Sequence, residues 1–423
     1  MPGVYSPVMS TDFQCASFCK NAMAYKKPSL KRWAYSKMVK ALILAAVSST
    51  AIAEDFKPNF SLILDGHYKS SNSALSEYEK GFGLGHVELG VSAAIDDLFY
   101  GKFTGVVHEH DNKTEFETEE AFIQTLALPG GFSVRAGRFL SDIGYLNGQH
   151  THSDSFVERP AVYRAMLGSH YYDDGVRLNY VMPTDTFWTI GTEAFGGNKM
   201  RAQGLNDPKS VGVYTAFTKI GGDFNEENSW QLGLSYLRNE NGASMTSGHD
   251  EHDHHDEHSH SHDHSHSHSH DHGNAHSHSH DAQFTGKNTY IAEAVWKWAP
   301  DGNYKYQNLT LSGEYLQAED ISETIKGNQK NEGFYLSSVF QMTSQWAVGA
   351  RYGEFKGYEA HGDHFHEQKL KESEFMVSWS HSHFSTVRLQ YTRQTGDGFE
   401  NIKNDIVTLQ YVMSLGAHDA HTF

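Results

Sequence analysis

Fifteen of the 29 histidines lie in one short segment, residues 249–281, where they alternate with serine, aspartate and glutamate. Neutral imidazole is a good ligand for Zn²⁺, Ni²⁺ and Cu²⁺, and the interspersed carboxylates add oxygen ligands and negative potential. No apolar side chain larger than Ala275 interrupts the segment, so it is not expected to pack into a core. The sequence therefore predicts a flexible tract that binds several ions in exchange, through His249, His252, His254, His255, His258, His260, His262, His264, His266, His268, His270, His272, His276, His278 and His280.

Three smaller groups of histidines share this chemistry: His108 and His110, His150 and His152, and His361, His364 and His366. Each group has a spacing of two or three residues, which lets a loop close two imidazoles on one metal ion. Ordinary exposed histidines explain any single group equally well, but the groups and the tract together favour metal binding. For the tract, the alternative is a solubilising or pH-responsive loop, since imidazole titrates near about pH 6.5.

The segments that must position these histidines alternate between apolar and polar side chains. Val407, Leu409 and Tyr411, for example, alternate with Thr408 and Gln410. A period of two is that of strands with one apolar and one polar face. Strands of this kind are predicted at about sixteen places: residues 60–68, 82–95, 98–108, 115–128, 131–140, 175–182, 187–196, 210–220, 229–238, 288–298, 308–318, 332–341, 345–355, 373–381, 384–394 and 405–415.

The connections between these strands alternate in length. Short turns such as Asp96-Asp97 and Pro129-Gly130 alternate with longer connections such as residues 141–174. This asymmetry is typical of a transmembrane antiparallel β-barrel with short periplasmic turns and long extracellular loops. A soluble β-sandwich or secreted barrel is the alternative, but the even strand number, the loop asymmetry and aromatic residues near strand ends favour the membrane barrel. The three small histidine groups are expected on extracellular connections.

The first 53 residues precede the predicted strands. A short basic start, an apolar run and Ala51-Ile-Ala53 are typical of a secretory signal peptide over residues 38–53. Residues 1–37 are then an upstream extension, with translation expected to begin at Met38. Cleavage removes seven basic residues, one acidic residue and both cysteines, so residues 54–423 carry a net charge of −24 and form no disulfide. This acidic balance argues against a nucleic-acid-binding protein.

With these features the mature chain resembles a sixteen-stranded bacterial outer-membrane porin. The resemblance implies passive diffusion, homotrimers in outer-membrane lipid, and a C-terminal Phe423 that the barrel-assembly machinery reads, although Asp419 and His421 depart from the usual apolar pattern. It also implies that the connection 141–174 folds inward and narrows the pore. Charged residues would line this constriction, among them Asp154, Glu158, Arg159, Arg164, Asp173 and Asp174.

The histidines make the chain similar to the His-rich outer-membrane proteins that bacteria make under zinc limitation. The similarity implies a channel for passive uptake of a divalent transition metal, with Zn²⁺ as the transported or bound ion, no required cofactor, and capture by residues 249–281. One alternative is a general or anion-selective porin with an incidental histidine loop, and another is a surface protein that sequesters metal. No G-x-S-x-G, H-E-x-x-H or phosphate-binding glycine motif occurs in the sequence, so no enzymatic activity is expected.

Overall fold

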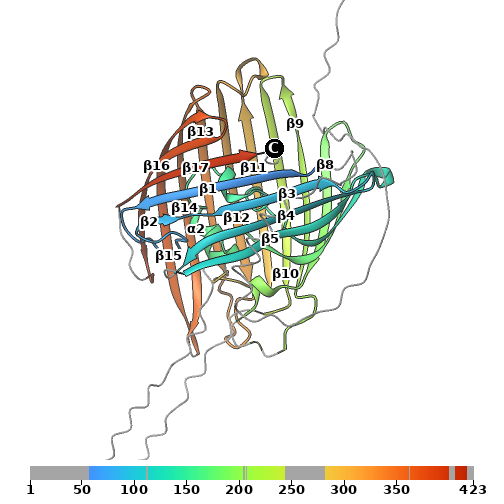
Figure 1. Cartoon of the computed structure of the whole chain (residues 1–423). Helices are drawn as coiled ribbons and strands as arrows, with labels where there is room; N and C mark the ends of the chain where they lie inside the picture. Colours follow the sequence, from blue (N-terminus) through green and yellow to red (C-terminus); the bar gives the residue numbers. More distant parts are fainter. Residues whose placement is uncertain are drawn as a thin grey trace, which may run out of the picture.

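The chain forms a closed antiparallel β-barrel, seen here in a computed structural model (Figure 1). The structure describes residues 57–110, 113–202, 205, 207–242, 282–361, 363–399 and 405–416. Within these ranges the strands are β1 Asn59–Lys69, β2 Gly81–Leu84, β3 Val87–Ala94, β4 Phe99–His110, β5 Lys113–Thr125, β6 Phe132–Leu140, β7 Tyr172–Val181, β8 Phe187–Phe195, β9 Val213–Asn225, β10 Asn228–Asn239, β11 Asn288–Trp298, β12 Asn308–Glu319, β13 Asn331–Gln341, β14 Trp346–His361, β15 His364–Ser382, β16 Ser385–Asp397 and β17 Asp405–Gly416.

The barrel closes between its first and last strands, where Leu62 of β1 pairs with Leu415 of β17. On its other side β1 pairs with both β2 and β3, so these two short strands occupy one position in the wall. The barrel therefore has sixteen strand positions, which confirms the predicted fold. Between β2 and β3, a Cβ atom on Gly85 would lie 2.2 Å from Oδ2 of Asp65, so glycine is needed where the backbone passes this carboxylate. His86, the next residue, is buried.

Two hairpins extend further than the alternating pattern predicted. Strand β4 continues to His110, whose partner across the hairpin is Lys113. Strands β14 and β15 continue until His361 pairs with His364. The histidines at these places therefore lie on the ends of strands, which corrects the prediction that they belong to connecting loops.

The two faces of the barrel wall differ in polarity. Leu389, Leu409 and Phe375 face outward and are 50%, 46% and 59% exposed, whereas Gln390 and Gln410 are almost completely buried inside. Apolar side chains on the outside and polar side chains on the inside are the reverse of a soluble barrel. This arrangement excludes the soluble β-sandwich and fits a wall surrounded by lipid.

One side of the interior is filled by the connection between β6 and β7, residues 141–171, which we call the inner loop. It contains the 3-10 helix η2 (Thr151–Ser153) and the α-helix α2 (Ala161–Leu167), and every residue of α2 is buried. Helix α2 packs against β13, β14 and β15, where Tyr335, Phe355 and Leu370 join its apolar cluster. A cavity of about 370 Å³ remains beside β3 to β6. The inner loop thus packs against β13 to β15, while open space remains beside β3 to β6.

The remaining short helices are 3-10 turns: η1 Pro129–Gly131, η3 Asn198–Met200 and η4 Pro300–Gly302. Over the described ranges, no helix combines the length and the apolar composition that crossing a membrane would require.

Candidate metal centre in the barrel interior

The beginning of the inner loop is held to the barrel wall by one carboxylate. Glu314 of β12 accepts hydrogen bonds from the backbone N–H groups of Tyr145 and Leu146, at 2.9 and 3.1 Å. It also accepts bonds from the hydroxyls of Tyr163 and Tyr335, both at 2.7 Å. Because a buried carboxylate with several donors is costly to disrupt, this contact fixes the entry of the loop into the barrel.

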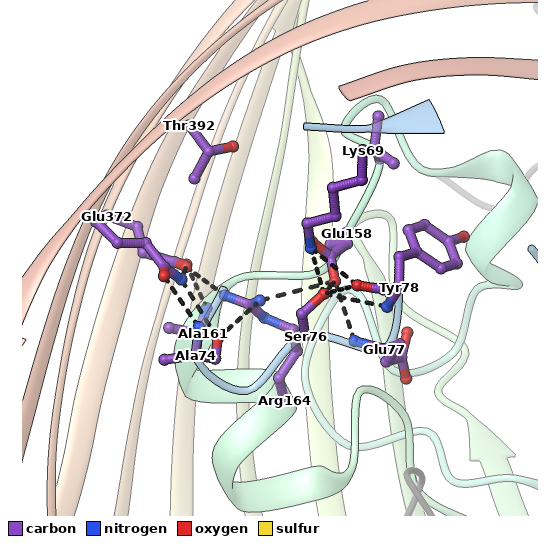
Figure 2. A network of polar contacts seen from close by, with 12 residues as sticks. Lys69, Ala74, Ser76, Glu77, Tyr78, Glu158, Ala161, Arg164, Glu372 and Thr392 are labelled. Atoms are coloured by element: carbon purple, nitrogen blue, oxygen red, sulfur yellow. Dashed lines mark hydrogen bonds and ion pairs between the residues drawn. The ribbon is translucent and has the colours of Figure 1, made fainter. Parts of the chain in front are cut away.

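A second set of contacts holds the end of the loop, and Figure 2 shows how they converge. We call Lys69, Glu158, Arg164, Glu372 and Gln394 the latch. Lys69 Nζ lies 2.8 Å from Glu158 Oε2, Arg164 pairs with Glu372, and the Gln394 amide donates to Glu372 at 2.6 Å. Burial raises the pKa of Glu158, but Lys69 and Arg164 lower it to about 2, so this carboxylate stays ionised. The latch thus joins the inner loop to strands β1, β15 and β16.

The residues predicted to line a constriction are therefore largely engaged in holding the loop. Glu158 and Arg164 belong to the latch, and Arg159 forms a buried ion pair with Asp154 at 2.8 Å. Two predictions require correction, because Asp173 and Asp174 lie on β7 rather than in the loop.

The two aspartates point in opposite directions. Asp173 is buried and accepts a hydrogen bond from the backbone of Asn198 at 2.7 Å. Asp174 is on the outward face, where it pairs with Arg138 at 2.8 Å, because side chains alternate along β7. Asp174 therefore does not line the interior.

On the open side of the interior, five side chains meet in what we call the acid–histidine cluster: Glu88 of β3, Glu119 and Glu120 of β5, and His150 and His152 of the inner loop. His150 bridges two carboxylates, with Nδ1 at 3.0 Å from Glu119 and Nε2 at 2.9 Å from Glu120. His152 Nδ1 lies 2.8 Å from Glu88. The ligand atoms of Glu88, His150 and His152 all lie within 4.8 Å of one another, close enough to hold one metal ion.

A β-bulge places both Glu119 and Glu120 in this cluster. In the pairing of β4 with β5, Thr104 is opposite Glu120 and Gly105 is opposite Thr118, so Glu119 is an extra residue. A bulge turns two consecutive side chains to the same side of a sheet. Both glutamates are consequently about as buried as each other, at 2% and 3% exposure. A regular strand would have turned one of them toward the outside of the barrel.

Further imidazoles extend the cluster toward the end of β4 at His110. His170 Nε2 lies 2.7 Å from Glu119. The rings of His170 and His86 have centroids 6.0 Å apart, and those of His86 and His108 are 6.4 Å apart. In the other direction, His152 borders two cavities of about 370 and 330 Å³. Metal-ligating groups therefore follow one another along the open side of the barrel.

A lysine lies within the cluster and offsets part of the charge of its three carboxylates. Lys102 Nζ lies 2.7 Å from Glu120 and 3.0 Å from His150 Nε2. Burial lowers the pKa of His150, but the carboxylates of Glu120 and Glu119 raise it, and the outcome lies well above the ordinary imidazole value. A divalent cation could replace the proton of His150 and bind carboxylate oxygen and imidazole nitrogen, a ligand set that suits Zn²⁺.

Three of the predicted metal ligands, His108, His150 and His152, are buried or nearly buried. His150 and His152 were predicted on an extracellular connection, but this connection is the inner loop, and each side chain is only 14% exposed. His108 is also buried, with Nε2 at 4.0 Å from Glu115. His108 thus lies on β4 rather than on a connection, whereas His150 and His152 lie on the connection that the porin resemblance predicted to fold inward.

The other predicted histidines are distributed over the far ends of the hairpins. His364 and His366 on β15 are exposed, with 3.2 Å between their Nε2 atoms, which is a geometry that one metal ion could bridge. His110 and His361 end β4 and β14. The remaining predictions fall outside the described residues: the tract 249–281, the extension 1–37, the signal peptide 38–53 and the terminal Phe423.

Sequence reasoning missed the three glutamates of the cluster. Glu88 has no distinguishing neighbours in the sequence, but β5 carries a signal. The outward apolar residues change from an even position, Phe116, to odd positions, Ala121 and Ile123. Such a change of parity indicates an inserted residue between them, because side chains alternate strictly in a regular strand.

No protein-family model matches the chain. An uncharacterized protein of Aquifex aeolicus (strain VF5) is 25% identical over 413 aligned residues, which cover 87% of this chain and 80% of that protein. Among solved structures, OmpT, an outer-membrane protein of Vibrio cholerae, superposes with a TM-score of 0.52 at 10% identity, covering 85% of this chain and 99% of OmpT. OprB of Pseudomonas putida gives a TM-score of 0.51 at 10% identity, with 85% and 94% covered. An anion-selective porin from Comamonas acidovorans gives 0.50 at 11% identity, with 86% and 100% covered. The chain therefore has the fold of the porin-like β-barrels of bacterial outer membranes.

Proposed function

We propose that the protein is a non-enzymatic outer-membrane channel for passive uptake of a divalent transition metal, with zinc as the transported ion. The observation that supports this most is the acid–histidine cluster, because three carboxylates and two imidazoles converge beside the open space of the barrel. In this mechanism the tract 249–281 captures Zn²⁺ outside, and His108, His86 and His170 lead toward the cluster. Exchange among several weak sites keeps transfer fast, since a single tight site would retain the ion.

Zinc accumulation by zinc-starved cells tests this proposal. Three isogenic strains are compared: intact, lacking the gene, and lacking only residues 249–281. Both deletions are expected to lower the initial rate of uptake when zinc is scarce. When zinc is abundant, the strain lacking only residues 249–281 should recover, because its barrel is intact and capture by the tract is no longer needed. Unchanged uptake in both deletion strains would mean that the barrel carries another solute.

The pH dependence of zinc binding separates the tract from the interior cluster. Protons compete with metal for imidazole, so binding by the purified protein should fall steeply between about pH 7 and about pH 5.5. Because the pKa of His150 is raised, the proton is harder to displace there. Zinc binding by protein lacking residues 249–281 should therefore already weaken at a higher pH than binding by the intact protein. Isothermal titration across this pH range measures the zinc affinity of the intact and the shortened protein. An affinity that does not change with pH would count against imidazole ligands.

A general or anion-selective porin remains the second candidate, favoured by the guanidinium groups of Arg135 and Arg177 at the cavity beside the cluster. The reversal potential across a planar bilayer reports the ion selectivity of the pore, and zinc entry into dye-loaded proteoliposomes distinguishes a metal channel from a porin that does not carry zinc. We also propose a homotrimer, supported by the trimer form in which the structurally similar OmpT is described. Barrel-assembly machinery would insert the chain into outer-membrane lipid.

A further inference from the structure

Arg135 on β6 is a cation without a directly paired carboxylate among the described residues. Its Nε and Nη2 both donate to the side-chain oxygen of Gln124, at 2.8 and 2.6 Å, and its guanidinium carbon lies 4.1 Å from the centre of the Phe122 ring. Arginine has five N–H donors, so these two bonds leave donors available. Arg135 borders the cavity of about 370 Å³ that also contacts His150 and His152.

The carboxylates that act electrostatically on Arg135 are already paired with other cations. Glu120 pairs with Lys102 at 2.7 Å. Glu193 pairs with Arg177 at 2.6 Å, and Asp142 pairs with Lys219 at 2.8 Å. Of these four cations, Lys102, Arg177, Lys219 and Arg135, only Arg135 has a positive charge left for an incoming anion to neutralise. A planar guanidinium suits a carboxylate because it can donate two parallel hydrogen bonds.

The distance between this cation and the acid–histidine cluster is short. Glu120 and Phe122 are two residues apart on β5 and both point inward, which separates them by roughly 7 Å along the strand. Arg135 stacks on Phe122, so it lies about one such step from the cluster. A hydrated Zn²⁺ in the cavity would be repelled by Arg135 and Lys102. In a complex of Zn²⁺ with a small anionic ligand, the ligand could face these cations while the metal faces the carboxylates of the acid–histidine cluster.

We propose that the channel accepts its metal as a complex with a small carboxylate chelator. The chelator's carboxylate binds Arg135, and the metal faces Glu120 and His150. This inference rests on the proposed function, because it specifies the form in which the metal passes. Arg135 is then a specificity-determining residue that selects the complex over the free ion.

Zinc entry into proteoliposomes loaded with a zinc-sensitive dye tests the inference. The full-length protein is supplied with the same total zinc either as zinc chloride or with equimolar citrate. Wild-type protein should admit zinc from the citrate mixture, and Arg135→Gln should lower that rate by about tenfold. The zinc chloride rate should stay the same or rise, because the guanidinium repels the free ion. Arg138→Gln, a change on the same strand but on the outward face, should behave like wild type.

The variant Arg135→Lys controls for a folding defect. Lysine keeps the positive charge but cannot donate two parallel hydrogen bonds, so zinc entry from the citrate mixture should be intermediate between wild type and Arg135→Gln. Equal loss from both zinc forms in Arg135→Gln, or no loss from either, would overturn the inference. If wild-type protein admits zinc chloride but not the citrate complex, the inference fails and the proposed function stands. If wild-type protein admits neither form, both fail.

Discussion

Zinc binding inside the barrel is expected to weaken by about 10- to 100-fold when Glu119 and Glu120 are both changed to glutamine. The two carboxylates hold the two nitrogens of His150, at 3.0 and 2.9 Å, and they supply most of the negative charge opposite Lys102. Glutamine keeps the size of each side chain but removes the charge that a divalent cation requires. Isothermal titration should use protein lacking residues 249–281, so that the tract does not mask the interior, and dye-loaded proteoliposomes should show slower entry at scarce zinc.

The matched control is the pair Glu319→Gln and Glu332→Gln on β12 and β13. This double variant removes the same formal charge from the far side of the barrel, where Glu319 pairs with Lys330 and Glu332 accepts a bond from Tyr315. Its zinc affinity should match that of the parent protein. If both double variants lose the same affinity, net charge rather than the cluster attracts the ion; if neither does, the cluster is not a metal site.

A large loss of stability is expected when the Arg164–Glu372 pair of the latch is broken. Arg164→Met would leave Glu372 buried without its cationic partner, and breaking one side of a buried ion pair costs about 3–5 kcal/mol. Because the latch holds the inner loop against β15 and β16, the loop should also move more freely. We expect a lower free energy of unfolding in detergent, together with a larger and noisier single-channel conductance.

The double variant Arg164→Met with Glu372→Leu controls for the unpaired charge. Replacing both members of a buried pair by apolar residues is often close to neutral. Glu372 also accepts hydrogen bonds from Ala161 and Gln394, so recovery of stability should be partial. Conductance should stay high in the double variant, because the ion pair between the loop and β15 is still missing. Unchanged conductance in both variants would show that the loop is held by the packing of α2 rather than by the latch.

The barrel itself could be predicted because its signal is local. Each strand carries its own alternation, as in Val407, Leu409 and Tyr411, and sixteen such segments with short turns between them determine a closed wall. The interruption between β2 and β3 could not be predicted, because it depends on the contact of Gly85 with Asp65 from another strand. Helix α2 was not predicted either, since seven residues are too short for a periodic signal and its burial depends on β13 to β15.

The candidate site was only partly predictable for the same reason. The spacing of His150 and His152 marked them as possible ligands, but their carboxylate partners are distant in sequence: Glu120 is 30 residues away from His150 and Glu88 is 64 residues away from His152. We inferred that the connection 141–174 folds into the barrel from the resemblance to porins, not from the pattern of its residues. The pairing of Glu158 and Arg164 with Lys69 and Glu372 likewise depends on tertiary contacts.

The extra residue at Glu119 has a genetic consequence. Loss of the single codon for Glu119 would restore a regular ladder with β4 and would remove one of the two inward-facing carboxylates. The barrel could still close, since the hairpin would keep its pairing, yet the interior would lose a ligand in one mutational event. Relatives that differ by one gap here can therefore share the architecture while differing in cargo, and a sequence comparison that treats such a gap as neutral would overlook the change.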